Sequence, residues 1–307
     1  VIGLAPSAAA AAALGEQLDG HSDTLAKLVW SLRNGETPDW IAEIGPQTLV
    51  IIDEAGMADT LSLDTAVQHV LECGGSVRLI GDDQQLAAIG AGGVLRDIEA
   101  TQGALRLTEL VRFTDRAEGS ASLALRGGDT SALGFYLDQR RIHVGDATTM
   151  ADDLFASWSA DKAGGLDSIM LAPTRELVAD LNQRARSQRL SDTEPGPQIE
   201  LADGNLASPG DTIITRTNNR KLRVSATDWV KNGDRWTIVG VDLRRGIHAR
   251  HTQSGRHVQL PLDYVAESVE LGYATTTHSA QGVTAATMHG LLAGSESRQQ
   301  AYTMLTR

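Results

Sequence analysis

The chain has 307 residues, of which 41% are hydrophobic and 21% charged, and its formal net charge at pH 7 is −12. This length predicts two compact domains, each large enough for its own core, and no run approaches the ~20 apolar residues of a membrane helix. The only cysteine, Cys73, excludes an internal disulfide and suits a reducing compartment, so we expect a cytoplasmic protein.

The first predicted elements are a strand and a helix joined by a serine. An apolar run at residues 1–5 is followed by Ser7 and then by an alanine-rich run that reaches Leu18. A serine at this place is a good N-cap, because its hydroxyl accepts a hydrogen bond from a free amide of the first helical turn.

The next strong signal is a buried strand that ends in two carboxylates. Residues 49–52 read Leu-Val-Ile-Ile, and Asp53 and Glu54 follow directly. Ligand sites in open α/β sheets lie beyond the carboxyl ends of the strands. There Asp53 can hold Mg²⁺, usually through water, and Glu54 can orient or deprotonate an attacking water. The alternative is that the pair only caps the following helix.

A second strand-like run covers residues 76–80 and is followed by Gly81, Asp82 and, a little later, Gln85. Glycine permits a tight exit from the strand, and the amide of Gln85 can sense a phosphate. An acidic pair followed at this spacing by such a segment resembles motifs II and III of superfamily 1 helicases. The resemblance is strongest to RecD-like enzymes and to the helicase region of TraI/TrwC-type (MobF) conjugative relaxases.

This resemblance implies an α/β fold with two RecA-like P-loop NTPase lobes built on parallel sheets, and it assigns roles to more residues. Ser7 lies in a stretch similar to motif Ia, which meets single-stranded DNA. The resemblance also implies that Gly81 and Asp82 contact the nucleotide. Arg112 lies in a stretch similar to motif IV and would approach the terminal phosphate, although it can also simply pair with Glu109 on a helix.

Later segments extend the resemblance to nearly the whole chain. Residues 170–177 look like the strand-to-helix turn of the second lobe, in which Thr174 is an N-cap and a possible contact to the DNA backbone. Residues 272–284 resemble motif V, although Thr284 replaces an acidic residue that many relatives carry. Arg307 ends a stretch similar to motif VI and would be the arginine finger. The resemblance thus predicts DNA contacts at Pro173, Thr174, Thr276, His278 and Ser279, and nucleotide contacts at Gln281 and Gly282.

Residues 210–262 change to short β-runs with turn signals such as Asn232-Gly233, and they resemble the SH3-like barrel that RecD-like helicases insert in the second lobe. Four basic residues and no acid lie in residues 216–223, a run that forms either a DNA-binding face or a solvated surface. Trp229 and Trp236 can stack on bases, but burial in a small β-core is expected for each.

The resulting domain prediction has a first RecA-like domain at residues 1–112, a second at 113–209 together with 263–307, and the barrel at 210–262. Residues 183–200, with their Pro-Gly-Pro turn, are expected to be a surface excursion. Residues 19–46 lie where relatives carry a small DNA-separating pin, a role that the residues do not support by themselves.

No stretch of the chain matches the phosphate-binding loop G-x-x-x-x-G-K-[ST]. We therefore expect an internal fragment of a longer helicase, which by itself binds ATP poorly and does not hydrolyse it. The intact protein is expected to use ATP and Mg²⁺ to move 5′→3′ along single-stranded DNA. Its likeness is greatest to a relaxase-helicase of the conjugation machinery. The alternatives are a RecD-like exonuclease subunit or repair helicase, and a non-catalytic DNA-binding module that has lost its phosphate loop.

Overall fold

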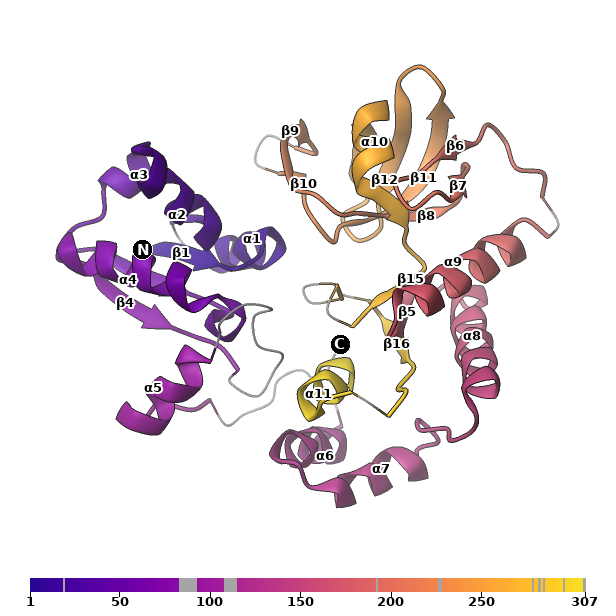
Figure 1. Ribbon diagram of the computed structural model, residues 1–307, viewed down its shortest axis with the longest axis horizontal. Helices are drawn as coiled ribbons and strands as arrows, with labels where there is room; N and C mark the ends of the chain where they lie inside the picture. Colours follow the sequence, from indigo (N-terminus) through magenta and orange to yellow (C-terminus); the bar gives the residue numbers. More distant parts are fainter. Residues whose placement is uncertain are drawn as a thin grey trace. The chain divides into compact units, whose positions relative to one another are not determined.

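The computed structural model describes residues 1–18, 20–82, 93–107, 115–191, 193–225, 228–277, 279–280, 283, 285–294 and 296–305. Two compact units divide the chain, Val1–Ser120 and Ala121–Arg307, and Figure 1 colours them along the sequence. The boundary between them falls inside α6 (Arg116–Gly127). The domain limits drawn from the sequence stay predictions.

Unit 1 is built on a four-stranded parallel sheet with the order β2-β1-β3-β4. The runs at residues 1–5, 49–52 and 76–80 form strands as predicted, because their apolar side chains fill the core beside the sheet. The strand β2 has the polar sequence His-Ser-Asp-Thr and was not predicted. The strands are β1 (Ile2–Ala5), β2 (His21–Thr24), β3 (Leu49–Ile52) and β4 (Ser76–Leu79).

Helices cover both faces of this sheet. Ile2 and Leu4 of β1 belong to the core that contains residues of α2 and α4. On the opposite face Gly3 lies against α1, where an added Cβ would be 2.8 Å from Cδ2 of Leu14. The helices are α1 (Ala8–Gln17), α2 (Leu25–Asn34), α3 (Asp39–Ala42), the 3-10 turn η1 (Ala55–Met57), α4 (Thr60–Glu72) and α5 (Val94–Gln102).

Unit 2 contains a three-stranded parallel sheet with the order β15-β5-β16. Its central strand is fully buried, and α8 and α9 contact it, as Figure 1 shows. The elements are β5 (Ser168–Ala172), β15 (Ala274–Thr276), β16 (Thr287–Gly290), η2 (Thr130–Ala132), α7 (Leu133–Asp138), α8 (Ala147–Ala163), α9 (Arg175–Arg189) and α11 (Arg298–Leu305).

The predicted barrel is an antiparallel sheet with the order β13-β12-β11-β8-β14. Its side chains alternate, so that in β12 Ile247 and Ala249 are buried while His248 and Arg250 face solvent. The fifth strand, β14, lies beyond the predicted limit at residue 262. The elements are β6 (Ile199–Glu200), β7 (Leu206–Ala207), β8 (Thr212–Thr215), β9 (Asn219–Arg223), β10 (Trp229–Val230), β11 (Arg235–Asp242), β12 (Gly246–His251), β13 (His257–Leu260), α10 (Leu262–Ser268) and β14 (Val269–Leu271).

The barrel and the parallel sheet of unit 2 share one hydrophobic core. Met170 of β5 and Leu181 of α9 belong to the same buried cluster as Ile213 and Trp236 of the barrel. Tyr273, between β14 and β15, belongs to it as well. The barrel is therefore packed onto the helix–sheet layer and does not hang from it by a linker.

Two expectations are corrected. Residues 183–189 continue α9 and are not a surface excursion, because Ala185 is buried against the core. Trp236 is fully buried as expected, but Trp229 is only half-buried, with the guanidinium of Arg220 4.8 Å from its ring centre. Over the described part of the chain, every helix is too short or too polar to cross a lipid bilayer.

Candidate functional site

The acidic pair lies in a turn that both neighbouring strands hold in place. The amide of Asp53 donates to the carbonyl of Leu4 in β1 at 2.8 Å, and the amide of Ala55 donates to the carbonyl of Ile80 after β4, also at 2.8 Å. Asp53 Oδ1 accepts the amide of Glu54 at 2.9 Å. The two carboxylates are therefore presented at the carboxyl edge of the sheet, where open α/β folds bind ligands.

Glu54 has a left-handed backbone, with φ 51° and ψ 35°. A residue with a Cβ is uncommon there, and such strain, of the order of 1 kcal/mol, persists only where surrounding contacts impose it. The hydrogen bonds on both sides of Glu54 impose this geometry. Strained residues of this kind are concentrated at functional sites, which makes Glu54 a candidate on structural grounds alone.

Asp53 and Glu54 do not cap the helix that follows them. The helix that follows, α4, is capped by Asp59, whose side chain accepts the amide of Ser62 at 2.9 Å. Hydrogen bonds from the Ser62 side chain and backbone lower the pKa of Asp59. Glu54 precedes only the short turn η1 and makes no capping hydrogen bond with its side chain.

Gly81 and Asp82 lie against the acidic turn. A Cβ at Gly81 would be 3.0 Å from the nitrogen of Ala55, and a Cβ at Gly56 would be 3.0 Å from the carbonyl oxygen of Asp82. Two glycines thus let the segment after β4 approach the segment after β3 backbone to backbone. Of the predicted nucleotide site, the structure brings these two segments together, whereas Gln85 and Arg112 lie outside the described residues.

Magnesium suits the donors at this place. Mg²⁺ takes oxygen ligands, keeps several waters and is commonly bound by one or two carboxylates together with substrate phosphates. Among the residues that the structure describes, no group of three or more His, Cys, Asp or Glu is arranged to hold a metal ion. The carboxylates of Asp53 and Glu54 are oxygen donors of the kind that Mg²⁺ accepts.

Hydroxyl side chains mark the ends of three further parallel strands. Ser7, after β1, caps α1 by accepting the amide of Ala10 at 3.1 Å. Thr174, after β5, caps α9 by accepting the amide of Leu177 at 3.3 Å. Both predicted caps are confirmed. Pro173, half-buried, separates Thr174 from the end of β5.

In unit 2, Thr276 ends β15 directly beside the end of β5, since it pairs with Ala172 in the parallel register. Its Oγ1 lies 3.0 Å from Oγ of Ser279, and its carbonyl accepts the amide of Ala280 at 3.0 Å. Thr174 and Ser279 are exposed and Thr276 is half-buried, so this edge presents hydroxyl groups, which commonly contact phosphates. His278, Gln281, Gly282 and Arg307 fall outside the described part of the chain.

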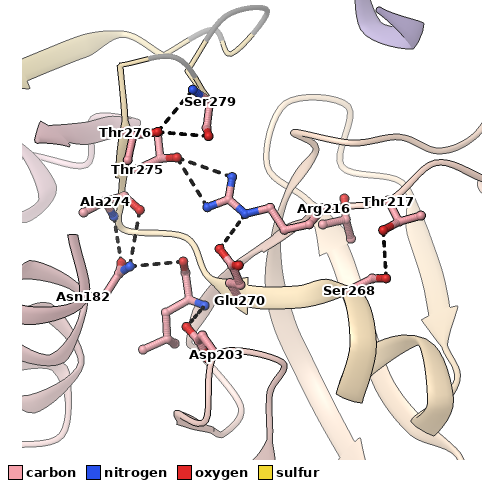
Figure 2. A network of polar contacts seen from close by, with 12 residues as sticks. Asn182, Asp203, Arg216, Thr217, Ser268, Glu270, Ala274, Thr275, Thr276 and Ser279 are labelled. Atoms are coloured by element: carbon pink, nitrogen blue, oxygen red, sulfur yellow. Dashed lines mark hydrogen bonds and ion pairs between the residues drawn. The ribbon is translucent and has the colours of Figure 1, made fainter. Parts of the chain in front are cut away.

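Sequence reasoning missed a polar network behind this edge, which Figure 2 shows. Arg216, counted as one member of a basic run, donates through Nε to Glu270 at 2.6 Å and through both terminal nitrogens to Thr275 at 3.4 Å. Asn182 of α9 accepts the amides of Tyr273 and Ala274 at 3.0 and 2.8 Å. Only the polar character of these residues was visible in the sequence, because their partners are far away along the chain.

Positive charge is concentrated on the barrel. Between residues 216 and 262 there are ten Lys or Arg and three Asp or Glu, in a chain whose net charge is −12. Arg235, unlike most of these cations, is buried, and it donates a hydrogen bond to Asp167 at 2.7 Å. Burial lowers the pKa of Arg235, and Asp167 partly offsets this effect. Most of the remaining cations are exposed.

Comparison with known proteins gives two family matches. A model described as an AAA domain matches residues 1–147, and one described as the Rv2311 SH3-like barrel domain matches residues 199–270. The uncharacterized protein Rv2311 of Mycobacterium tuberculosis is 38% identical over 82 residues, which are 26% of this chain and 47% of that protein.

Longer relatives match the whole chain. A probable conjugal transfer protein TraA of Sinorhizobium fredii is 28% identical over 312 residues, which are 100% of this chain and 27% of that protein. The ATP-dependent RecD2 DNA helicase of Deinococcus radiodurans is 27% identical over 313 residues, 99% of this chain and 41% of that protein. The chain thus spans well under half the length of these relatives.

Among solved structures, a Pif1 helicase from Bacteroides in complex with ADP-AlF3 and single-stranded DNA is similar, with a TM-score of 0.60 and 18% identity. The similarity covers 100% of this chain and 80% of that one. At this identity the likeness concerns the fold. It confirms the predicted RecA-like α/β lobes with parallel sheets, and the family match at residues 199–270 confirms the SH3-like barrel.

Proposed function

Because this chain is a relative of the RecD-like DNA helicases of superfamily 1 and of conjugal transfer TraA proteins, we propose that it is the motor region of an ATP-dependent DNA helicase. The motor hydrolyses ATP with Mg²⁺ and moves 5′→3′ along single-stranded DNA. The observation that carries the proposal is the strained acidic turn after β3, against which Gly81 and Asp82 are packed.

In this proposal Asp53 holds Mg²⁺ through water, and Glu54 orients and deprotonates the water that attacks the terminal phosphate. The half-buried position of both carboxylates supports these roles, since it limits competition from bulk water. The remaining nucleotide contacts are proposed from sequence resemblance alone, and they are Gly81, Asp82, Gln85, Arg112, Gln281, Gly282 and the arginine finger Arg307.

The proposed DNA contacts lie at strand ends. Ser7 acts from unit 1, and Thr174 and Thr276 act from neighbouring strand ends of unit 2. Their hydroxyls and the adjacent amides suit phosphate groups, which fix position without reading sequence. Pro173, His278 and Ser279 complete the set. The basic barrel adds long-range attraction to the same polyanion.

We further propose that the whole protein serves DNA transfer, since the TraA relatives are named as conjugal transfer proteins. The RecD2 relative is named as a DNA helicase, which keeps a repair helicase or exonuclease subunit as the alternative. A non-catalytic DNA-binding module is the third candidate. It predicts DNA binding without any hydrolysis.

Two measurements test the proposal. Fluorescence anisotropy of a labelled oligothymidine tests whether this chain binds single-stranded DNA, and absence of binding would contradict all three candidates. DNA-stimulated ATP hydrolysis is then measured for a version that carries a phosphate-binding loop ahead of Val1. There Glu54→Gln should retain nucleotide binding and lose turnover by about 100-fold or more, the usual size of a general-base effect. Unchanged turnover would remove Glu54 from catalysis. If neither this chain nor the version with the phosphate-binding loop hydrolyses ATP, the binding module is favoured.

A further inference from the structure

The segment that connects the barrel to the parallel sheet of unit 2 is fixed along its length. It runs from β14 through Gly272 and Tyr273 into β15. The amide of Gly272 donates to Thr212 of β8 at 2.9 Å, and a Cβ at Gly272 would lie 2.6 Å from the carbonyl carbon of Ile213. Only glycine fits such a close backbone approach. The segment therefore passes directly against the barrel and not through a loop.

Asn182 fixes the same segment from the helix side. Its Oδ1 accepts the amides of Tyr273 and Ala274, and its Nδ2 donates to the carbonyls of Leu271 and Ala274 at 3.3 Å. All these groups are buried, so an unpaired amide here would be costly. With α9 on one side and the barrel on the other, the start of β15 has little freedom.

Arg216 extends this control to the residue before the candidate DNA edge. It directly follows β8, and its own amide donates to Ser268 at 2.8 Å. Its guanidinium is oriented by Glu270 and reaches Oγ1 of Thr275, which is fully buried in β15. Figure 2 shows the guanidinium between Glu270 and Thr275. A barrel residue thus contacts Thr275 directly.

The next residue, Thr276, begins the turn that carries Ser279. Its hydroxyl lies 3.0 Å from that of Ser279 and 3.4 Å from the amide of the same residue, and its carbonyl accepts the amide of Ala280. A displacement of Thr275 moves Thr276, because the two share a peptide bond that permits only two soft rotations per residue. Arg216 is therefore linked to this turn through its contact with Thr275 and the peptide bond between Thr275 and Thr276.

We propose that Arg216 is a positioning residue that couples the barrel to the contacts of Thr276 with Ser279 and Ala280. This proposal rests on the proposed function, because the turn is taken to contact DNA. Arg216 does not bind DNA itself, because its side chain is only 22% exposed and is already paired with Glu270. A displacement of the barrel reaches the turn through the contact of Arg216 with Thr275.

Hydrogen exchange of the free chain tests the coupling without DNA. Arg216→Met and Thr275→Val should each make the amides of Ser279 and Ala280 exchange about tenfold faster, the factor expected from losing one charge-assisted hydrogen bond. Thr275→Ser keeps the hydroxyl and should exchange like the unmodified chain. The amide of Leu177, capped by Thr174, is an internal control on a different strand end. Unchanged exchange at residues 279 and 280 would overturn the proposal.

Binding of an oligothymidine distinguishes positioning from direct contact. Arg216→Met should weaken binding about tenfold, and combining it with Thr275→Val should cause no further loss, since both remove the same link. The slope of log K against log salt should not change, whereas Arg250→Met, at an exposed barrel arginine, should lower it by about one if that residue meets a phosphate. Additive losses, or a lower slope for Arg216→Met, would overturn the positioning role. A chain that binds no DNA would contradict the proposed function, while hydrogen exchange would still decide the role of Arg216.

Discussion

Glu54 combines a predicted catalytic role with an unfavourable backbone. Among the described residues, Glu54 and Arg140 are the non-glycine positions with positive φ. The sequence identified Glu54 by its place after an apolar strand, whereas its left-handed conformation became visible only when the strands on both sides of β3 were in place. Chemistry and strain therefore point to the same residue by independent routes.

Replacement of Glu54 by glycine should stabilise the fold. Glycine adopts positive φ without a steric penalty, so Glu54→Gly should raise the free energy of unfolding by up to about 1 kcal/mol. Urea denaturation followed by circular dichroism measures this change. The control is Ala58→Gly, four residues later in extended backbone with φ −82°, where glycine should lower stability by about 1 kcal/mol or more because it also removes a buried methyl group. Equal destabilisation by both would show that Glu54 is unstrained.

The cap residues were predicted correctly, whereas of the two tryptophans expected to be buried only Trp236 is. Ser7 and Thr174 bind amides only three residues away, so the local sequence contains the whole interaction. Trp229 is half-buried beneath Arg220, whereas Trp236 is fully buried. Which of two tryptophans enters a core depends on strand pairing across the barrel, and that information is not local.

At the scale of elements, Asp211 joins α9 to the barrel. Its fully buried carboxylate accepts Arg189 at 2.7 Å, Arg186 at 3.2 Å and the hydroxyl of Tyr273 at 2.7 Å. Burial alone would raise the pKa of Asp211, but the hydrogen bonds from Arg189, Tyr273 and Ser208 outweigh it, and the pKa lies below its ordinary value. Burial and the charge of Asp211 raise the pKa of Tyr273.

These shifts predict how stability depends on pH. Because the pKa of Asp211 is lower in the folded state, its contribution is complete above the unfolded value of about 3.9 and is lost as pH falls below it. Tyr273 stays neutral when folded, so stability also falls above about pH 10, where the unfolded tyrosine ionises. Asp211→Asn should destabilise unit 2 by about 3 kcal/mol and flatten the acid limb of the stability profile. Urea midpoints measured from pH 3 to 7 check this, and an unaltered acid limb would contradict it.

The crossover from β14 to β15 provides a second test at this scale. Gly272→Ala would place a Cβ 2.6 Å from the backbone of Ile213, and the resulting overpacking should cost about 1–3 kcal/mol. Gly240→Ala in β11 is the control, since a Cβ there meets nothing within 4 Å, and it should change stability little. Thermal denaturation of the two variants gives the comparison. Similar melting temperatures would mean that the crossover can move aside.

Elements were predictable where apolar runs define them. β3 and β4 match predicted runs within one residue. By contrast β2, with the sequence His-Ser-Asp-Thr, and β16, with Thr-Met-His-Gly, carry little strand signal. They become strands because β1 and β5 offer parallel edges for hydrogen bonding. Pairing partners override local propensity in such cases.

For the whole molecule, the separate cores of the two units predict two unfolding transitions. The core of unit 1 contains Leu28 and Val50, and that of unit 2 contains Trp158 and Trp236. Asp211→Asn should lower only the transition of unit 2, and the control Val50→Ala only that of unit 1. Fluorescence of variants that keep tryptophans in one unit separates the signals. One transition shifted by both substitutions would show that the units unfold together.

The sequence by itself identified the candidate functional groups of this protein. The acidic pair after β3, the glycine after β4 and the hydroxyl caps after β1 and β5 are local patterns, since an apolar strand and the turn behind it lie within about ten residues. The basic composition of the barrel is likewise a property of the sequence. Through the family resemblance that they support, these features predicted two parallel-sheet lobes and a β-insertion.

Only the tertiary structure decided how these parts are connected. Arg216 meets a partner 59 residues away at Thr275, and Asn182 meets one 92 residues away at Ala274. Nothing in the neighbourhood of either residue distinguishes it from a surface arginine or a helix asparagine. Their role depends on β14 closing the barrel sheet and leading directly into β15, because long-range pairing of strands is fixed by the fold and not by the residues beside them.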